Sequence, residues 1–239
     1  MTEAPGLHLE GNLSFGSGSS PLAVDLKIAP GEWTCLLGPS GVGKSTLLRT
    51  IAALPAGGEY VGTLGEDPTM LKGQVAYMAQ DDGLAPWLNV TQNVCLGAKL
   101  RGEPADVERA ATLIDQVGLS GDAFKKPRAL SGGMRQRAAL ARTLMEDRSI
   151  VLLDEPFSAL DAKNRAEMQE LTYQALDGRT VLLVTHDPAE AVRLGHSIRL
   201  MGADQIEEVS PPAMPPLRDQ SDPAVLAAGA ALLNRLRGV

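Results

Sequence analysis

The sequence predicts an α/β fold with a mostly parallel central sheet. Short apolar segments typical of buried strands alternate with helical segments, as where Ile150–Leu153 is followed by the amphipathic Ala162–Leu176. A glycine-rich segment, Gly38–Gly43, joins an apolar strand to a helix. Near the N-terminus, Leu7–Phe15 and Leu22–Ile28 alternate between apolar and polar residues, which predicts an antiparallel pair beside the parallel core.

The elements follow from these patterns in chain order, and we find no internal repeat. Turn residues at 16–21 and 29–32 bound the second strand, and Gly118–Gly121 and Pro127 interrupt a long helical pattern. Asp187 is expected to cap the helix that starts at Pro188, and Gly195 follows the end of that helix. The expected strands are 7–15, 22–28, 33–37, 74–79, 150–153 and 180–185. The expected helices are 44–54, the interrupted 105–148, 162–176, 188–194 and 224–237.

The composition is that of an ordinary globular protein. The 239 residues include 44% hydrophobic and 21% charged side chains, and 22 basic against 29 acidic residues give a net charge of −7. A nucleic-acid partner requires a basic surface, so nucleic acid is not expected. The longest apolar run, Ala224–Leu233, is shorter than the roughly 20 residues of a membrane span, and the N-terminus lacks a signal-peptide pattern, so we expect a cytoplasmic chain. Cys35 and Cys95 are expected to be reduced thiols.

A phosphate-binding loop is the strongest local signal. The segment Gly38-Pro39-Ser40-Gly41-Val42-Gly43-Lys44-Ser45-Thr46 fits G-x-x-x-x-G-K-[ST] between a buried strand and a helix. Glycines let backbone N–H groups converge on phosphate oxygens, and the following helix N-terminus adds unpaired donors. Lys44 can reach the outer phosphates, and the Ser45 hydroxyl can ligate Mg²⁺. The similarly glycine-rich 16–20 lies between antiparallel strands and is expected to be a hairpin turn.

An acidic pair supplies the second half of this site. Ile150–Leu153 is a fully apolar strand, and Asp154 and Glu155 follow at its carboxyl end, where α/β folds place ligands. Asp154 is expected to hold Mg²⁺ through water, and Glu155 to act as general base or to orient the attacking water. Together with the phosphate loop, the pair predicts a nucleoside-triphosphate hydrolase.

The segment Leu130-Ser131-Gly132-Gly133-Met134-Arg135-Gln136-Arg137 resembles the signature sequence of ATP-binding-cassette (ABC) ATPases, and the resemblance covers most of the chain. It implies a P-loop cassette with a RecA-like parallel core, an antiparallel β subdomain and an α-helical signature subdomain. Ser131 is well placed to cap the following helix, and the glycines allow close approach to a phosphate. In that fold, one chain's signature cannot reach its own nucleotide. Two copies therefore pack head to tail, each signature facing the other's phosphate loop.

The resemblance also assigns roles to single residues. Gln80, after the strand at 74–79, is similar to the glutamine that senses Mg²⁺ and water, and His186, after the strand at 180–185, to the histidine that bonds the γ-phosphate. Phe15 replaces the usual tyrosine that stacks on adenine, with packing into the core as the alternative. Asp187 beside His186 is expected to cap a helix. The implied contacts to the partner's ATP are Ser131, Gly132, Gly133, Gln136 and Asp161.

The resemblance implies boundaries and a choice between functions. Residues 1–210 form the ATPase domain with a helical subdomain at about 81–148, and 211–239 form a turn-rich segment and a helix, expected to pack on the domain rather than on a membrane. The chain carries one phosphate loop and one signature, which excludes a twin cassette. The Gln80–Ser131 stretch is expected to be helical throughout and is too short for the coiled coil of DNA-repair or chromosome-organising ATPases. Transport is favoured; lipoprotein export or cell-division work, and soluble DNA repair, are alternatives.

Within that family, the signature and the segment Asp154–Asp161 resemble bacterial importers of nitrate, sulfonate, taurine and hydroxymethylpyrimidine, the thiamine precursor. Leu84–Val90 resembles a stretch of that group near the permease, and a docking region at Gln80–Val90 is expected. Trp87 and Leu88 are expected near the groove that receives a permease helix, with packing into the core as the alternative. The cofactors implied are ATP and Mg²⁺, and the partners are a second copy, permease subunits and, indirectly, a solute-binding protein. The chain would lie peripherally on the cytoplasmic face of the cell membrane. The solute stays open, with a slight preference for the pyrimidine.

Overall fold

The computed structural model describes residues 4–15, 20–65, 71 and 73–237, and most of the turn expected at 16–21 lies outside them. The chain forms two compact units. The first unit comprises Met1–Tyr77, Ser149–Glu155 and Gly178–Val239, and the second comprises Met78–Arg148 and Pro156–Asp177. The expected helical subdomain at about 81–148 falls within the second unit, and the subdomain bounds stay a prediction. Each unit is described by itself.

The main sheet has six strands in the order β5-β6-β7-β3-β8-β9. β3 runs parallel to both β7 and β8, β6 runs parallel to β7, and β8 and β9 are antiparallel. Every residue of β3, β6 and β7 is buried, which explains why four of the five residues in each of these strands are apolar. The strands are β3 (Trp33–Leu37), β5 (Val75–Met78), β6 (Ile150–Asp154), β7 (Thr180–Val184), β8 (Ser197–Met201) and β9 (Ile206–Val209).

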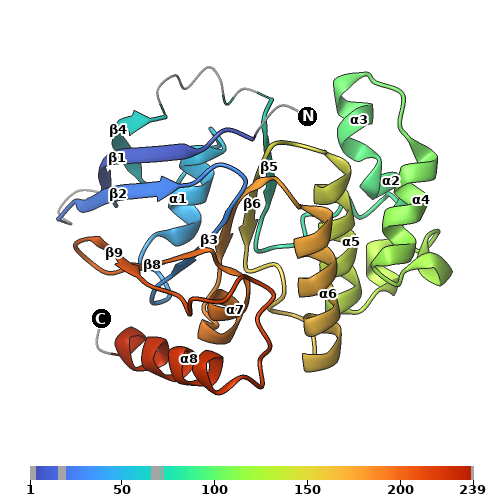
Figure 1. Ribbon diagram of the computed structural model, residues 1–239. Helices are drawn as coiled ribbons and strands as arrows, with labels where there is room; N and C mark the ends of the chain where they lie inside the picture. Colours follow the sequence, from blue (N-terminus) through green and yellow to red (C-terminus); the bar gives the residue numbers. More distant parts are fainter. Residues whose placement is uncertain (1–3, 16–19, 66–70, 72, 238–239) are drawn as a thin grey trace. The chain divides into compact units, whose positions relative to one another are not determined.

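A second sheet of three antiparallel strands belongs to the first unit, in the order β2-β1-β4 (Figure 1). Its strands are β1 (Leu7–Ser14), β2 (Leu22–Ile28) and β4 (Glu59–Leu64). β2 alternates strictly between buried and exposed residues, as its sequence predicts. Gly11 of β1 pairs with Gly62 of β4, and a Cβ on Gly62 would lie 2.3 Å from the Glu10 carbonyl oxygen. The glycines therefore let these two strands approach closely.

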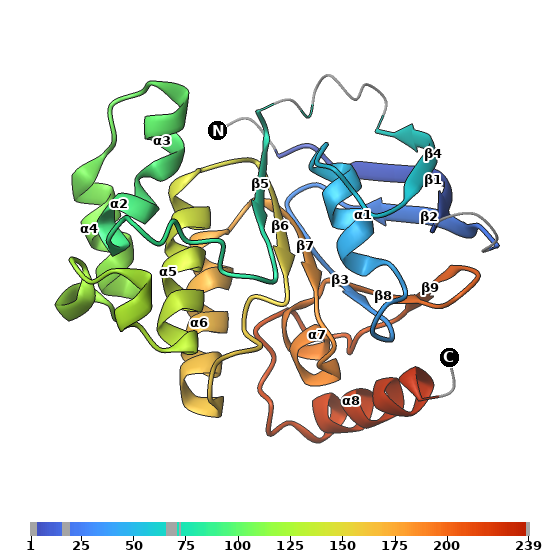
Figure 2. The same cartoon turned by 180° about the vertical axis from the view of Figure 1, so that it is seen from behind.

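Three helices complete the first unit: α1 (Lys44–Ile51), α7 (Pro188–Leu194) and α8 (Pro223–Leu236). α8 packs along α7, as both views of the molecule show (Figure 1, Figure 2). The buried Arg218 fixes the segment before α8, because its guanidinium donates to the carbonyls of Val192 and Gly195 at the end of α7, both at 2.8 Å. The expected packed terminal helix is therefore observed.

The second unit is helical. Its helices are α2 (Val90–Val94), α3 (Leu96–Arg101), α4 (Val107–Gln116), α5 (Gly132–Met145) and α6 (Ala162–Ala175), with short 3₁₀ turns at Ser120–Asp122 and Pro127–Ala129. The expected helical pattern at 105–148 contains both α4 and α5. The chain between these two helices includes Gly118 and Pro127, where an interruption was expected. The expectation of helix throughout Gln80–Ser131 is wrong for 80–89, which form an irregular loop. The buried Asn93 amide group bonds backbone carbonyls of that loop, including Leu88 at 3.2 Å, and so replaces helical hydrogen bonds.

The sequence patterns did not predict strands β4, β8 and β9. β4 carries a central glycine and is mostly exposed, so it lacks the apolar alternation of a half-buried strand. β8 and β9 are short strands that pair as an antiparallel hairpin, and no pattern of turn residues at 202–205 was used to predict it. Across the residues that the structure describes, no helix has both the length and the apolar character needed to span a bilayer.

A candidate nucleotide-binding site

The phosphate loop leaves β3 and enters α1 in the first unit. Gly41 and Gly43 have φ angles of +82° and +112°, a region that side chains disfavour. A Cβ on Gly38 would lie 2.4 Å from the Met201 carbonyl oxygen, and one on Gly43 would lie 2.1 Å from the Phe15 ring. The glycines of the pattern are therefore required by backbone conformation and by close neighbours. Phe15 lies against the phosphate loop and packs against the core, so the core packing is present, whereas stacking on adenine stays a prediction.

Lys44, the first residue of α1, is only 7% exposed. Its ammonium donates to the carbonyl oxygens of Gly38 at 2.8 Å and of Pro39 at 2.9 Å, which holds the side chain folded back over the loop. Burial lowers the pKa of Lys44, and the nearby carboxylates of Glu155 and Asp154 oppose that shift. The loop thus holds a buried cation beside the acidic pair.

Asp154 ends β6 and is 2% exposed. Its Oδ2 accepts a hydrogen bond from the Tyr77 hydroxyl at 3.4 Å, whereas Oδ1 is buried with no hydrogen-bond partner among the described residues. Burial raises the pKa of this carboxyl group, while hydrogen bonding from Ser45 and Tyr77 and the charge of Lys44 lower it.

This carboxylate fits a magnesium ligand. A buried carboxylate oxygen without a partner is costly unless a cation or water satisfies it, and Ser45 lies beside it. Mg²⁺ typically takes only one or two protein carboxylates and fills its shell with water and phosphate oxygens. In keeping with that chemistry, the described part of the chain holds no cluster of three or more His, Cys, Asp or Glu side chains that could bind a metal by themselves.

Glu155 and His186 meet at the carboxyl ends of neighbouring strands, β6 and β7. The Glu155 Oε2 and His186 Nδ1 atoms lie 3.1 Å apart. Glu155 has a φ of +50°, and its backbone N–H donates to the Val184 carbonyl at 2.9 Å, which fixes the turn in which the strand ends. The His186 side chain is 61% exposed, so it remains accessible to a ligand. The two residues expected to act on the γ-phosphate and the attacking water therefore lie in contact.

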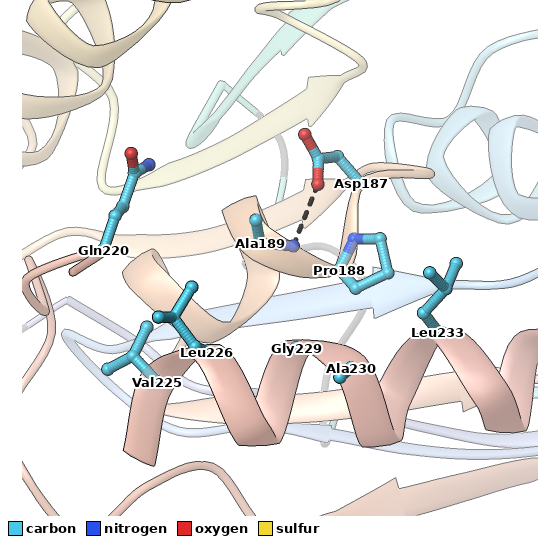
Figure 3. A pocket seen from close by; sticks show the side chains of 9 residues that line it. All are labelled: Asp187, Pro188, Ala189, Gln220, Val225, Leu226, Gly229, Ala230 and Leu233. Carbon is cyan, nitrogen blue, oxygen red and sulfur yellow. Dashed lines mark hydrogen bonds between the residues drawn. The ribbon is translucent and has the colours of Figure 1, made fainter. Parts of the chain in front are cut away.

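Asp187 is a helix cap, as expected. Its carboxylate accepts the Ala189 N–H at 2.9 Å at the start of α7, which Figure 3 shows as a dashed line. The same figure shows an apolar groove between this end of α7 and the face of α8 that carries Leu226 and Leu233.

The signature segment lies in the second unit. Ser131 caps α5, with its hydroxyl accepting the Met134 N–H at 3.2 Å, as the sequence predicts. Ser131 and Gly132 are exposed. A Cβ on Gly132 would meet only a flexible arginine side chain at 4.0 Å, whereas a Cβ on Gly133 would lie 3.2 Å from the Ala159 carbonyl oxygen. The exposed start of a 14-residue helix offers unpaired N–H groups to an anion.

Gln136 differs in its surroundings from the other signature residues expected to contact a partner's nucleotide. It is 6% exposed, and both ends of its amide bond the 158–159 loop of the same chain.

The other expected site residues of the second unit lie at its surface. Asp161 is exposed and caps α6, accepting the Asn164 N–H at 3.0 Å. Gln80 follows β5 directly, is exposed, and belongs to the second unit. The sequence patterns did not indicate Tyr77, because its position beside Asp154 follows from the pairing order of the sheet, in which β5 is the neighbour of β6.

These motifs can be weighed against known proteins. The model of the ABC transporter family matches residues 22–158, more than half of the chain. The chain belongs to the ABC transporter family. The predicted family, fold class and nucleotide are thereby confirmed: the chain is an ABC cassette that binds ATP with Mg²⁺ and hydrolyses it.

Relatives of this cassette carry importer names. An ABC transporter ATP-binding protein of uncharacterised function from Haemophilus influenzae is 43% identical over 189 residues, 78% of each chain. The aliphatic sulfonates import ATP-binding protein SsuB 1 of Pseudomonas syringae is 42% identical over 90% of this chain and 88% of its own length. The aliphatic sulfonates import ATP-binding protein SsuB of Bacillus subtilis is 42% identical over 75% of this chain and 71% of its own length.

Solved structures agree with the family. A dimeric structure of a bacterial ABC transporter cassette is similar with a TM-score of 0.75 and 29% identity, covering 89% of this chain and 99% of the other. The post-hydrolysis state of that cassette, bound to ADP and phosphate, has a TM-score of 0.72 and 30% identity over the same shares.

Proposed function

We propose that this cassette powers the import of an aliphatic sulfonate through separate permease subunits, acting as one half of a head-to-tail homodimer. The observation that carries the hydrolytic part is the gathering of Lys44, Asp154 and the Glu155–His186 pair at one edge of the main sheet. The names of relatives about 42% identical over most of the chain support import and favour a sulfonate over the pyrimidine. No observation favours lipoprotein export or DNA repair.

The first unit binds the nucleotide in this proposal. Backbone N–H groups of Gly38–Gly43 and the start of α1 bond the phosphates, together with Ser40, Thr46 and the other loop residues. Lys44 exchanges its carbonyl partners for phosphate oxygens, since its ammonium is already held over the loop. Phe15, at the loop, stacks on the adenine. Ser45 and Asp154 would hold Mg²⁺, which would neutralise charge on the outer phosphates when bound. The role of Gln80 in sensing Mg²⁺ and water stays a prediction.

Hydrolysis depends on the contact between Glu155 and His186. The Glu155 carboxylate accepts a hydrogen bond from the attacking water and so orients it toward the γ-phosphate. With a hydrogen on each ring nitrogen, the His186 side chain donates one hydrogen bond to the Glu155 carboxylate, 3.1 Å away, and offers the other N–H to a phosphate oxygen. The pair links nucleotide recognition to the position of the water.

The second unit acts on the partner's nucleotide. Ser131, Gly132 and Gly133 present the exposed helix start to the γ-phosphate bound by the other chain, and Asp161 contacts the partner near the same place. ATP closes the dimer because these contacts exist only in the closed state. The dimeric structures of a similar cassette support this assembly.

The permease docks on the second unit near Gln80–Val90. Trp87 is 70% exposed, unusual for a large apolar side chain and typical of an interface anchor. A groove begins at the neighbouring Leu88 and continues over α2 and α3, lined also by Gln92, Cys95, Lys99, Glu103 and Ala105. This docking would place the cassette peripherally on the cytoplasmic face of the membrane, with a solute-binding protein as an indirect partner.

Reconstitution with the permease and solute-binding protein tests the transport claim. We expect ATP hydrolysis to rise when the binding protein carries an alkanesulfonate, and to remain basal with nitrate or hydroxymethylpyrimidine. Stimulation by one of those two alone would reassign the solute within the importer class. Stimulation by DNA, with no response to any permease, would contradict import.

A further inference from the structure

Gln136 makes contacts that a residue reaching for a partner's nucleotide would not make. Its side-chain carbonyl accepts the Ala159 N–H at 2.8 Å, and its amide nitrogen lies 3.2 Å from the Ser158 hydroxyl. Both ends of a buried amide are thus engaged by two successive residues of one loop. A planar group held at both ends fixes the position of that loop as well as its own orientation.

A second contact joins the same two segments one helical turn earlier. Gly133 and Gln136 are three residues apart on α5 and therefore share a face. The Ala159 carbonyl and the Leu160 side chain lie so close to Gly133 that a Cβ there would be 3.2 and 3.3 Å away. The first turn of α5 and the loop after β6 are thus packed together at two points within the second unit.

The loop has its own anchors on either side of this contact. Phe157 is fully buried, and its carbonyl accepts the Leu160 N–H at 3.2 Å. Asp161 begins α6 as its cap. Between these anchors, Ser158 and Ala159 are exposed, and their positions depend on Gln136.

We infer that Gln136 is a positioning residue that holds the Ser158–Ala159 loop against the start of α5, so that Ser131–Gly133 and Asp161 reach the partner chain as one surface. The inference rests on the proposed head-to-tail dimer. It assigns Gln136 no contact with ATP. Without the amide, the distance between Ser131–Gly133 and Asp161 would no longer be fixed. The phosphate-loop site of the first unit would be unchanged.

The test compares Gln136→Met, which keeps the length of the side chain but neither hydrogen bond, with Ser158→Ala, which removes one bond at an exposed position. We expect kcat to fall about 100-fold in Gln136→Met, the scale of a small displacement of groups around a reaction. In Ser158→Ala it should fall about fivefold, the scale of one ordinary hydrogen bond. ATP affinity of the monomer should stay within twofold of the parent, because the binding loop lies in the other unit. Gln116→Met, on the exposed end of α4, is the matched control and should match the parent.

The double variant distinguishes positioning from general support of the fold. Because both substitutions break the same contact, Gln136→Met with Ser158→Ala should be no slower than Gln136→Met alone. Additive losses, or a fall in monomer ATP affinity that parallels the fall in kcat, would overturn the inference. So would parental kcat in both single variants. A parent chain that does not hydrolyse ATP would overturn the proposed function itself, which is a separate result measured first.

Discussion

The two compact units present their functional residues in opposite ways. In the first unit, Lys44 is 7% and Asp154 2% exposed, and their partners are already arranged around the phosphate loop. In the second unit, Ser131 and Gly132 are exposed at the start of α5. Buried charges suit a pocket that binds its ligand within one chain, whereas an exposed helix start suits an anion brought by another molecule. The cassette therefore holds one part of a reaction site as buried charged groups at the phosphate loop, and the other part as an exposed helix start.

The largest effect on kcat should come from Glu155→Gln, in the first unit. The amide keeps the size of the side chain and removes the carboxylate that orients the attacking water, so kcat should fall by about 10²–10⁴-fold. ATP affinity should hardly change. Phosphate release under single-turnover conditions measures the rate, and a kcat within threefold of the parent would remove Glu155 from the mechanism.

Lys44→Ala should weaken ATP binding by about 100-fold, since it removes charge-assisted bonds to the outer phosphates. Titration with a fluorescent ATP analogue measures this. Lys99→Ala, on α3, serves as a control because it removes the same charge from the second unit. Unchanged ATP affinity in the Lys44 variant would contradict the assignment of the phosphate loop as the ATP site.

A surface substitution should behave differently. Trp87→Ala should leave the ATPase rate of the isolated chain unchanged and weaken its association with the permease about 30-fold, as loss of an exposed aromatic anchor does. Co-purification of tagged permease measures the association. Phe124→Ala is the control, because Phe124 is also highly exposed in the second unit. Equal losses in both variants would argue against a specific role for Trp87.

Phe15→Leu tests whether the Phe15 ring stacks on the adenine. Leucine keeps apolar packing but loses the flat ring, so KM for ATP should rise about tenfold, the value of one stacked base. Phe15→Tyr should remain close to the parent. If the leucine variant keeps a parental KM with a lower melting temperature, Phe15 serves only the core.

The smallest effect concerns stability. Asp154→Asn removes a buried carboxylate whose Oδ1 has no hydrogen-bond partner among the residues that the structure describes. The melting temperature without nucleotide should rise by about 2–4 °C, the shift of roughly 1 kcal/mol in a chain of this size. The further rise on adding Mg²⁺ and ATP should be lost. Differential scanning fluorimetry measures both, and a lower melting temperature without nucleotide would contradict this view of Asp154.

Local sequence determined most of what was predicted correctly. The strand Trp33–Leu37, the following loop and the start of α1 at Lys44 form one continuous segment, whose residue types match a single local pattern. The helix was expected to reach Leu54 but ends at Ile51, and Ala53 has a φ of +53°. Pattern reading could not show this, because alanine is a good helix former.

Contacts between distant segments were not readable from the sequence. Gln136 was grouped with partner contacts because it lies in the signature, but its burial depends on a loop more than twenty residues further on, which no local pattern shows. The closeness of Phe15 to Gly43 and of Tyr77 to Asp154 likewise arises only when the sheets form.

The central claim is that the phosphate-loop site of one chain and the exposed signature of another chain complete one another only between two chains. Light scattering on the Glu155→Gln variant tests it directly, with and without saturating Mg²⁺ and ATP. We predict the mass of one 25.1 kDa chain without ATP and about twice that mass with ATP. Adding Lys44→Ala or Ser131→Arg to the variant should return it to the single mass. A Glu155→Gln chain that stays at the single mass with ATP bound would contradict the account.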